Sequence, residues 1–270
     1  MIKRDILTTD LLYAWSQETD EVYSDIHCHA EYEIYYFIRG DVDYRIEGRH
    51  YTMNPESLLL IPPKNFHGVT ARSTRPHQRI SVHFVPELLD EAERSLLLEM
   101  FHASRLYYPD VSMHRIGFLV QSLFNCKDME EPLQKIAVRH RAVSLLTYIY
   151  QLYLQNLVCP APKDERIQAM LGYLNRNLHD SVSLDTLCRE FHISRNHLNV
   201  IFRKETGTTV THYIRIKRLV MARQEILKGC TAEEAAYRAG FNDYSNFYRA
   251  YKAFFGIIPS NKTREWPTES

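Results

Sequence analysis

The sequence predicts a two-domain α+β protein, with an N-terminal antiparallel β-barrel followed by helices and an all-α C-terminal domain with two helix-turn-helix motifs. Three observations lead to this prediction. Short apolar runs separated by turn residues extend to about residue 85. Helical periodicity replaces them from Pro86 onward. Near the C-terminus a helix-turn-helix pattern is repeated, because Phe202–Gly207 aligns with Tyr251–Gly256.

The predicted barrel covers residues 1–85, and its strands are rich in aromatic and β-branched residues. They are expected at Glu33–Arg39, Val42–Ile46, Ser57–Ile61 and Ile80–Phe84. Turn-forming pairs such as Gly40-Asp41 and Glu47-Gly48 separate them. Short strands at this spacing are typical of an antiparallel barrel or sandwich. The preceding stretch, with Tyr13, Trp15 and Tyr23, is expected to fold over the barrel mouth as an arm.

Residues 86–158 form a predicted helical region that we expect to carry a dimer contact. Its helices are expected at Leu88–Phe101, Ile116–Phe124 and Leu133–Leu157. Apolar residues recur at heptad-like spacing on the last helix: Ile136, Val143, Leu146, Tyr150, Tyr153 and Leu157. The alternative interpretation is a helix buried against its own barrel. Pro160 and Pro162 cannot continue a helix, so residues 159–163 are interpreted as a linker.

Residues 164–265 are predicted to be entirely helical. The expected N-caps are Ser183, Ser194, Thr231 and either Asn242 or Asp243. One long helix, Thr209–Leu227, separates the two motifs. At about 1.5 Å per residue it spans roughly 28 Å. With its flanking turns this length approaches the roughly 34 Å of one DNA turn, so both motifs can reach successive major grooves.

In each motif the second helix has a predicted core stripe and a separate polar face. The core stripes are expected to be Leu198, Ile201 and Phe202, then Phe247, Tyr251 and Phe254. The outward residues are Arg195, Asn196, Asn199 and Arg203, then Tyr244, Ser245, Arg249 and Lys252. A recognition helix needs this division, because one side packs while the other reads base edges. Asn can pair bidentately with adenine and Arg with guanine.

The net charge of zero conceals an asymmetry between the two halves. Residues 163–270 carry 17 Lys and Arg against 12 Asp and Glu, whereas residues 1–162 carry 16 against 21. A basic C-terminal half fits nucleic-acid binding confined to one end. The sequence has no membrane-length apolar run, signal-peptide layout, disulfide framework, Gly-rich phosphate loop or nucleophile elbow. We therefore expect a cytoplasmic protein that is not an enzyme.

The two C-terminal motifs contain a set of apolar, capping and glycine positions: Ile193-Ser194, Leu198, Phe202, Gly207, Gly240-Phe241, Asp243, Phe247, Phe255-Gly256 and Pro259. With these residues the motifs resemble the AraC/XylS-type DNA-binding domain. The resemblance implies a bipartite domain on adjacent major grooves and activation through RNA polymerase. Carried over by position, the base-reading slots fall on Asn196, Asn199, Val200, Tyr244, Ser245 and Arg249, with Arg195 beside them. Phosphate contacts are expected from Ser194, Arg203, Lys204, Asn246 and Lys252.

Two barrel segments resemble the cupin motifs. His27, His29 and Glu33 match the first motif, and His67 ends the second. In cupin enzymes these residues bind one metal, and three imidazoles with a carboxylate suit Zn, Fe, Mn or Ni. Regulators of the resembling family commonly keep this stretch at a sensor pocket without catalysis. Three interpretations stay open: a divalent metal site, a polar small-molecule pocket, and inert barrel structure.

Tyr35, Phe37 and Arg39 share parity with Glu33 on one strand, so we expect them to face the barrel lumen with the histidines. Aromatic faces suit the C–H surfaces of sugars, and charged groups suit hydroxyls. The family resemblance likewise implies sugars or other small metabolites.

We expect a homodimeric, ligand-responsive transcription factor that binds operator DNA, a carbohydrate-type effector and RNA polymerase, with no membrane partner and no required cofactor. The alternatives are a ligand-independent DNA-binding regulator and a metal-dependent cupin enzyme fused to a DNA-binding module.

Overall fold

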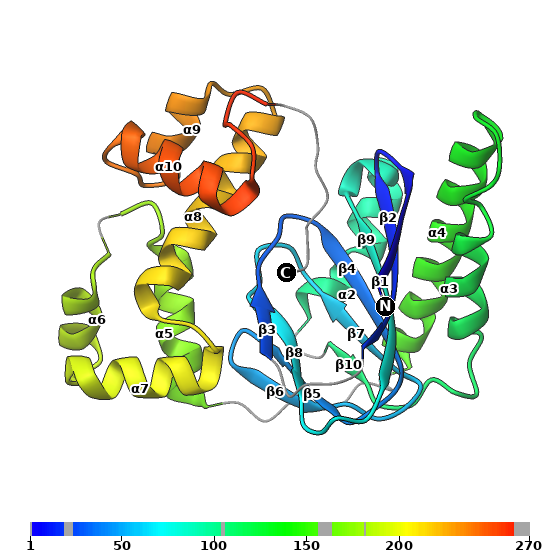
Figure 1. Ribbon diagram of the computed structural model, residues 1–270, viewed down its shortest axis with the longest axis horizontal. Coiled ribbons are helices and arrows are strands. Elements are labelled where there is room, and N and C mark those ends of the chain that lie inside the picture. Colours follow the sequence, from blue (N-terminus) through cyan, green and yellow to red (C-terminus); the bar gives the residue numbers. More distant parts are fainter. Residues whose placement is uncertain (1, 19–23, 104–105, 156–163, 181, 262–270) are drawn as a thin grey trace.

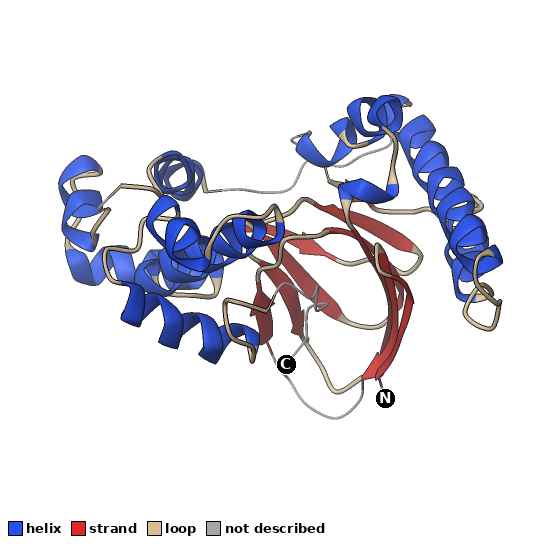
Figure 2. Cartoon of the chain, turned by 90° about the horizontal axis from the view of Figure 1, so that it is seen from above, coloured by secondary structure: helices blue, strands red, loops and turns tan. Residues whose placement is uncertain are grey.

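The computed structural model describes residues 2–18, 24–103, 106–155, 164–180 and 182–261. A β-barrel built from two antiparallel sheets lies at the centre of the molecule (Figure 1). Helices α3 (Ile116–Phe124) and α4 (Leu133–Leu154) cover one side of the barrel. A purely helical C-terminal domain packs against the other side (Figure 2). The predicted α+β class and the order of its two domains are confirmed.

The barrel strands follow one another with short turns. They are β1 (Ile2–Thr8), β2 (Leu11–Glu18), β3 (Ser24–His27), β4 (Tyr32–Arg39), β5 (Val42–Ile46), β6 (Arg49–Thr52), β7 (Ser57–Ile61), β8 (His67–Ala71), β9 (His77–Phe84) and β10 (Tyr107–Tyr108). One sheet has the order β1-β2-β9-β4-β7-β10, and the other has the order β3-β8-β5-β6. The expected strands correspond to β4, β5, β7 and β9, and the predicted bounds of β5 and β7 are confirmed.

The N-terminal stretch is part of the barrel, so the prediction of an arm over its mouth is wrong. β1 and β2 form a hairpin, and β2 pairs with β9 from Leu11 opposite Phe84 to Glu18 opposite His77. Tyr13 is buried in the barrel core, and Trp15 packs against that core. Tyr23 lies outside the described residues. At the other end, β10 pairs with β7, so the barrel includes a strand beyond the expected boundary at residue 85.

The helical region after the barrel differs from the prediction at its start. The expected helix Leu88–Phe101 is divided into a 3-10 turn, Pro86–Leu88, and two helices, α1 (Glu91–Leu97) and α2 (Glu99–His102). Asp90 is the N-cap of α1, and its side chain accepts a hydrogen bond from the Glu93 amide at 2.9 Å. The side chains of Asp90 and Glu93 therefore set a helix start that apolar periodicity alone does not reveal.

Helix α4 packs on α3 and on β1, and its heptad-like residues divide between two faces. Leu146 is buried in the barrel core, as the alternative interpretation required, and Val143 packs against that core. Ile136 is 54 % exposed. The helix ends at Leu154, and Leu157 lies outside the described residues.

Every regular element among the described residues of the C-terminal domain is a helix. Its helices are α5 (Glu165–Arg176), α6 (Leu184–Glu190), α7 (Arg195–Thr206), α8 (Val210–Leu227), α9 (Ala232–Arg238) and α10 (Tyr244–Phe255). The predicted N-caps are confirmed, because Ser183, Ser194, Thr231 and Asp243 each accept a backbone hydrogen bond. The glycines that follow α7 and α10, Gly207 and Gly256, are left-handed, which ends both helices in the same way.

Candidate functional site

The two helix-turn-helix units are α6–α7 and α9–α10, and α8 joins them. Four residues of the predicted core stripes are completely buried: Leu198, Phe202, Phe247 and Tyr251. Phe254 was also expected in the core but is 37 % exposed. Phe255 takes the inner position instead, with its ring 4.5 Å from that of Tyr251. The last turn of α10 therefore presents a different residue to the core than the spacing predicted.

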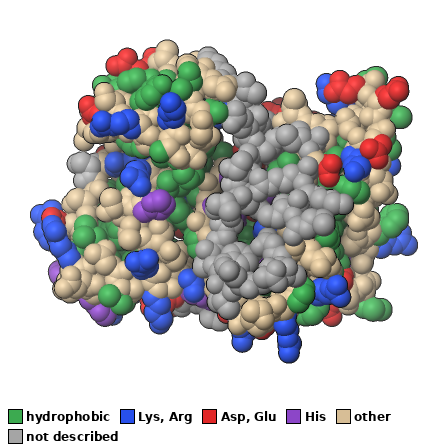
Figure 3. Space-filling model, viewed as in Figure 1, with side chains coloured by type: hydrophobic (Ala, Val, Ile, Leu, Met, Phe, Trp, Pro, Cys, Tyr) green, Lys and Arg blue, Asp and Glu red, His purple; other side chains and the backbone are tan. Residues whose placement is uncertain are grey.

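The residues expected to contact DNA lie on the outward faces of α7 and α10. Those that the structure exposes are Ser194, Arg195, Asn196, Asn199, Val200, Arg203, Lys204, Ser245, Asn246, Arg249 and Lys252. Tyr244 is half-buried, because its ring packs 5.7 Å from Phe247. On the face shown in Figure 3, Lys and Arg side chains are spread over the helical domain and do not form one block. The polar faces are thus accessible to a partner.

Two arginines on these faces have partners within their own motif. The Arg195 guanidinium donates to both Asp185 carboxylate oxygens, at 2.7 and 2.5 Å. This hydrogen bonding lowers the pKa of Asp185. Arg249 donates to the Asn246 side-chain oxygen at 2.5 Å. Each arginine must therefore leave or share a protein acceptor to contact a base.

The barrel brings together the four predicted cupin-like residues. His27 ends β3, His29 follows it, Glu33 lies on β4 and His67 begins β8. One ligand atom from each residue lies within 4.8 Å of all the others. Glu33 Oε2 lies 3.2 Å from His29 Nε2 and 3.0 Å from His67 Nε2. We call His27, His29, Glu33 and His67 the histidine cluster.

His83 lies beside the histidine cluster and was missed by the sequence reasoning. It lies opposite Glu33 in the β4–β9 register, with its Nε2 3.9 Å from Glu33 Oε1. Only the pairing of β4 with β9 reveals this position. Burial lowers the pKa of His83 to about 3, although the Glu33 carboxylate opposes the shift. Burial raises the pKa of Glu33, but the neighbouring histidines outweigh it and hold that pKa well below its usual range.

The predicted lumen residues are only partly brought together. Tyr35 and Phe37 are completely buried. The ring of Tyr44 lies 4.6 Å from that of Tyr35, and the Arg79 guanidinium lies 5.5 Å above Tyr35. Arg39, in contrast, is at the exposed end of β4 and donates to the Gln78 side chain at 3.0 Å. The register of β4 against β9 shifts between Phe37 and Arg39, which breaks the alternation that predicted a lumen position.

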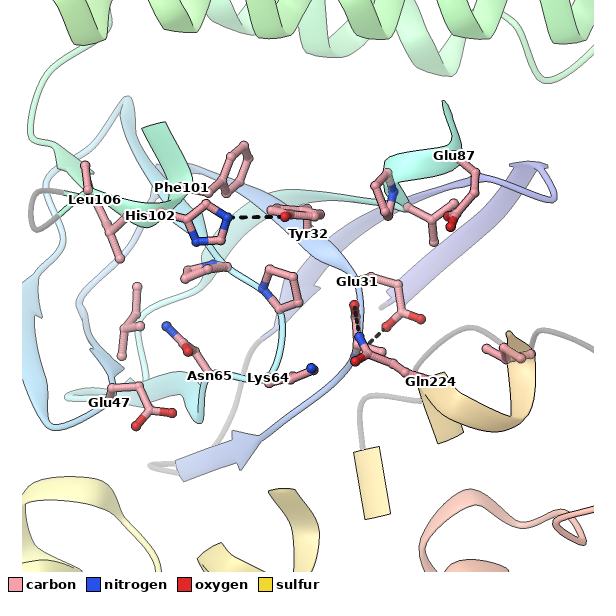
Figure 4. A pocket seen from close by; sticks show the side chains of 18 of the residues that line it. Glu31, Tyr32, Glu47, Lys64, Asn65, Glu87, Phe101, His102, Leu106 and Gln224 are labelled. Atoms are coloured by element: carbon pink, nitrogen blue, oxygen red, sulfur yellow. Dashed lines mark hydrogen bonds between the residues drawn. The ribbon is translucent and has the colours of Figure 1, made fainter. Parts of the chain in front are cut away.

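A cavity of about 840 Å³ lies outside the lumen, between the barrel and the helical domain. Tyr32, Phe101 and His102 line the barrel side, and Gln168 and Gln224 line the helical side. Figure 4 shows the Tyr32 hydroxyl hydrogen-bonded to His102 and shows Lys64, Asn65 and Glu31 around the same space. The predicted lumen residues are not among those that line it.

Comparison with known proteins assigns both halves of the chain. Residues 11–131 match the AraC-like ligand binding domain, and residues 187–265 match a helix-turn-helix domain. The chain belongs to the AraC-type regulators. As an AraC-type regulator it binds DNA and carries a ligand-binding domain. Within the described residues, every helix is too short or too polar to cross a membrane.

Similar proteins include regulators of comparable length. The transcriptional regulator YbfI of Bacillus subtilis is 23 % identical over 229 residues, covering 82 % of this chain and 80 % of YbfI. The transcriptional activator NphR of a Rhodococcus species is 25 % identical, covering 84 % of this chain and 68 % of NphR. Among solved structures, fatty-acid-bound ToxT of Vibrio cholerae is 14 % identical and covers 94 % of both chains, with a TM-score of 0.43. This structural overlap is too low to transfer a ligand.

Proposed function

We infer that this AraC-type regulator reads two successive major grooves with α7 and α10. The observation that supports this proposal is the division of both helices into a buried apolar stripe and an exposed polar face. The 18 residues of α8 between the two motifs extend about 27 Å. With the flanking turns, that length approaches the roughly 34 Å of one DNA turn.

The proposed base readers are the residues on these outward faces, with Asn196 and Asn199 suited to adenine and Arg249 to guanine. Arg203, Lys204 and Lys252 lie farther along their helices and are proposed phosphate contacts. Selection of binding sites from random-sequence duplexes tests the proposal. We expect two short conserved boxes about one helical turn, roughly 10 base pairs, apart. A single box, or no enriched sequence, contradicts bipartite reading.

We further propose that the effector is a small polar molecule, with carbohydrates as the first class to test, bound in the lumen beside the histidine cluster. Buried imidazoles, the Glu33 carboxylate and the Tyr35 ring offer hydrogen bonds and an aromatic face. A thermal-shift screen of sugars and sugar acids tests the class. We expect a hit that is lost in His67→Gln. A panel without any stabilising compound favours the ligand-independent regulator instead.

A divalent metal in the histidine cluster is the second candidate, because the donors are already close together. A tetrahedral site with bonds of about 2.1 Å needs donor atoms roughly 3.4 Å apart. The separations in the cluster are up to 4.8 Å, so small side-chain movements suffice. His27, His29, Glu33 and His67 would hold the ion, which would supply a charged anchor for an effector oxygen. Elemental analysis of protein purified without a His tag tests the metal site. A substoichiometric metal content that does not rise when zinc is added excludes this site.

The cavity between the domains is an alternative effector site. Burial and the nearby Lys228 and Lys217 lower the pKa of the half-buried Lys64 ammonium, and the Glu225 carboxylate opposes this shift. An organic anion in the cavity would pair with this ammonium directly. Lys64→Gln and His67→Gln separate the two sites, because each removes stabilisation by a ligand that uses its own site and leaves the other unchanged.

The assembly proposed for this regulator is a homodimer through the outer face of α3 and α4. On these two packed helices Phe118 is 74 % exposed, Leu133 59 % and Ile136 54 %. Apolar side chains this exposed favour a protein contact, and a second copy satisfies them symmetrically. Action in the cytoplasm and contact with RNA polymerase are proposed from the family.

A further inference from the structure

One acidic side chain of the barrel reaches into the helical domain and is largely covered there. Glu47, in the β5–β6 turn, accepts from the Lys217 ammonium at 2.6 Å and from the Tyr213 hydroxyl at 2.7 Å. Its main-chain oxygen accepts from the Gln168 side chain at 2.7 Å. The Lys217 side chain is only 3 % exposed. We call Glu47, Gln168, Tyr213 and Lys217 the Glu47 latch.

The barrel holds Glu47 in place for this contact. Its φ is 47°, in the left-handed region that non-glycine residues rarely adopt. The Glu47 amide donates to the Phe66 carbonyl, and the Phe66 amide donates back to Glu47 Oε1, both at 2.8 Å. Both hydrogen bonds lie within the barrel, so they orient Glu47 independently of its contacts with the helical domain. The Glu47 latch is thus a specific contact. An ion pair between two solvent-exposed side chains would lack the hydrogen bonds to Phe66 that orient Glu47.

The segments that support the latch also carry the histidine cluster. Phe66 precedes His67, and its ring stacks 4.7 Å from Tyr213 of the latch. Cys28 lies between His27 and His29 and is buried in the core of the helical domain. The Ala30 carbonyl, next to His29, accepts from Gln224 of α8 at 3.3 Å. Along these segments, successive residues therefore alternate between facing the histidine cluster and facing the helical domain.

This alternation gives a physical route between the domains. A ligand that draws His29 or His67 inward pulls on the adjacent backbone, and the neighbouring residues Ala30 and Phe66 already contact α8. Close-packed interiors transmit such shifts, because they contain little free space to absorb them. Since α8 joins the two helix-turn-helix units, a change in its docking alters the position of both recognition helices relative to the barrel.

We propose that the Glu47 latch is the positioning contact through which the histidine cluster controls the docking of the DNA-binding domain. The proposal rests on the proposed function, in which that cluster is the effector centre. Occupation of the cluster changes the packing of Phe66 and Cys28, and the latch transmits the change to α8. The proposal predicts reciprocal coupling. A substitution at the latch must change ligand binding at the cluster, and a substitution at the cluster must change the docking of α8 at the latch.

The experiment is amide hydrogen exchange on the full-length protein, read at α8 and, as an internal control, at α4. Glu47→Gln is expected to speed exchange in α8 by about fivefold or more and to leave α4 unchanged. His50→Gln is the matched control, because His50 pairs with Glu205 at 3.0 Å across the same interface but touches neither the latch nor the cluster. It should change α8 exchange by less than about twofold. If Glu47→Gln leaves α8 unchanged, the positioning role is overturned.

Coupling is tested from the cluster side with Glu33→Gln. We expect faster exchange in α8, and a smaller additional effect of Glu47→Gln in that background than in the wild type. An α8 unaffected by Glu33→Gln makes the latch purely structural and overturns the coupling. Zinc provides a second arm: if it binds, Glu47→Gln should change its affinity about threefold or more, and His50→Gln should not. Equal zinc affinities overturn the coupling, whereas no zinc binding to the wild type contradicts only the metal candidate and leaves the decision to Glu33→Gln.

Discussion

The depressed pKa of His83 predicts that the metal-free barrel loses stability as the pH falls from 7 to 5. An imidazole in the unfolded chain takes up its proton near pH 6.5, whereas buried His83 does so at about 3. Between these values only the unfolded chain binds the proton, so stability is present above pH 6.5 and is lost as the pH falls. At about 1.4 kcal/mol for each pH unit, the loss from His83 between pH 7 and 5 is about 2 kcal/mol.

Urea unfolding at pH 7 and pH 5 in the presence of EDTA measures this loss. Trp15 packs against the barrel core and reports on the barrel alone in a Trp266→Phe background. His83→Gln should reduce the pH-dependent difference in the free energy of unfolding by about 2 kcal/mol. His140→Gln, which changes an exposed histidine of α4, should leave the difference unchanged. If His83→Gln keeps the full wild-type pH dependence, His83 is not buried in its neutral form and the reasoning is refuted.

Three further predictions concern DNA binding and assembly. Arg249→Ala should weaken binding to the selected site by about 1–3 kcal/mol and relax the preference at one base pair; an equal loss on scrambled DNA in fluorescence anisotropy would assign Arg249 to a phosphate. Phe247→Ala removes a completely buried ring between Phe241 and Tyr251, so the helical domain should lose about 3–5 kcal/mol in chemical denaturation. A loss below about 1 kcal/mol would contradict its role in the core. Phe118→Glu should shift the protein from dimer to monomer in multi-angle light scattering; a wild type that is already monomeric excludes the α3–α4 contact.

The sequence predicted the elements whose signals are local. Hydroxyl and carboxylate caps such as Ser194 and Asp243 mark the starts of α7 and α10, and glycines mark their ends. Alternating and turn-bounded runs gave β5 and β7 with correct bounds. The hairpin β1–β2 was missed because its aromatic residues have the same pattern in an arm and in a strand. Its long-range pairing with β9 decides between the two, and local sequence does not encode that pairing.

The candidate sites were predictable where a motif fixes both residue type and spacing. His27, His29, Glu33 and His67 come together as the cupin-like spacing predicts. His83 and Arg79 reach the same lumen only through the register of β9, and a one-residue shift of β4 carries Arg39 out of it. The Glu47 latch joins residues far apart in the chain, so it emerges only when the two domains are packed.

The internal partners of Arg195 and Arg249 have a consequence for the proposed base contacts. Before DNA arrives, Asp185 already satisfies Arg195, and Asn246 already satisfies Arg249. A proposed base contact is therefore made only where the base accepts hydrogen bonds better than these side chains. A mismatched base leaves them folded back on the protein, and the contact is then not made. Because the protein acceptor must be given up, each proposed arginine–base contact contributes less net affinity than the same contact made by an unpaired arginine.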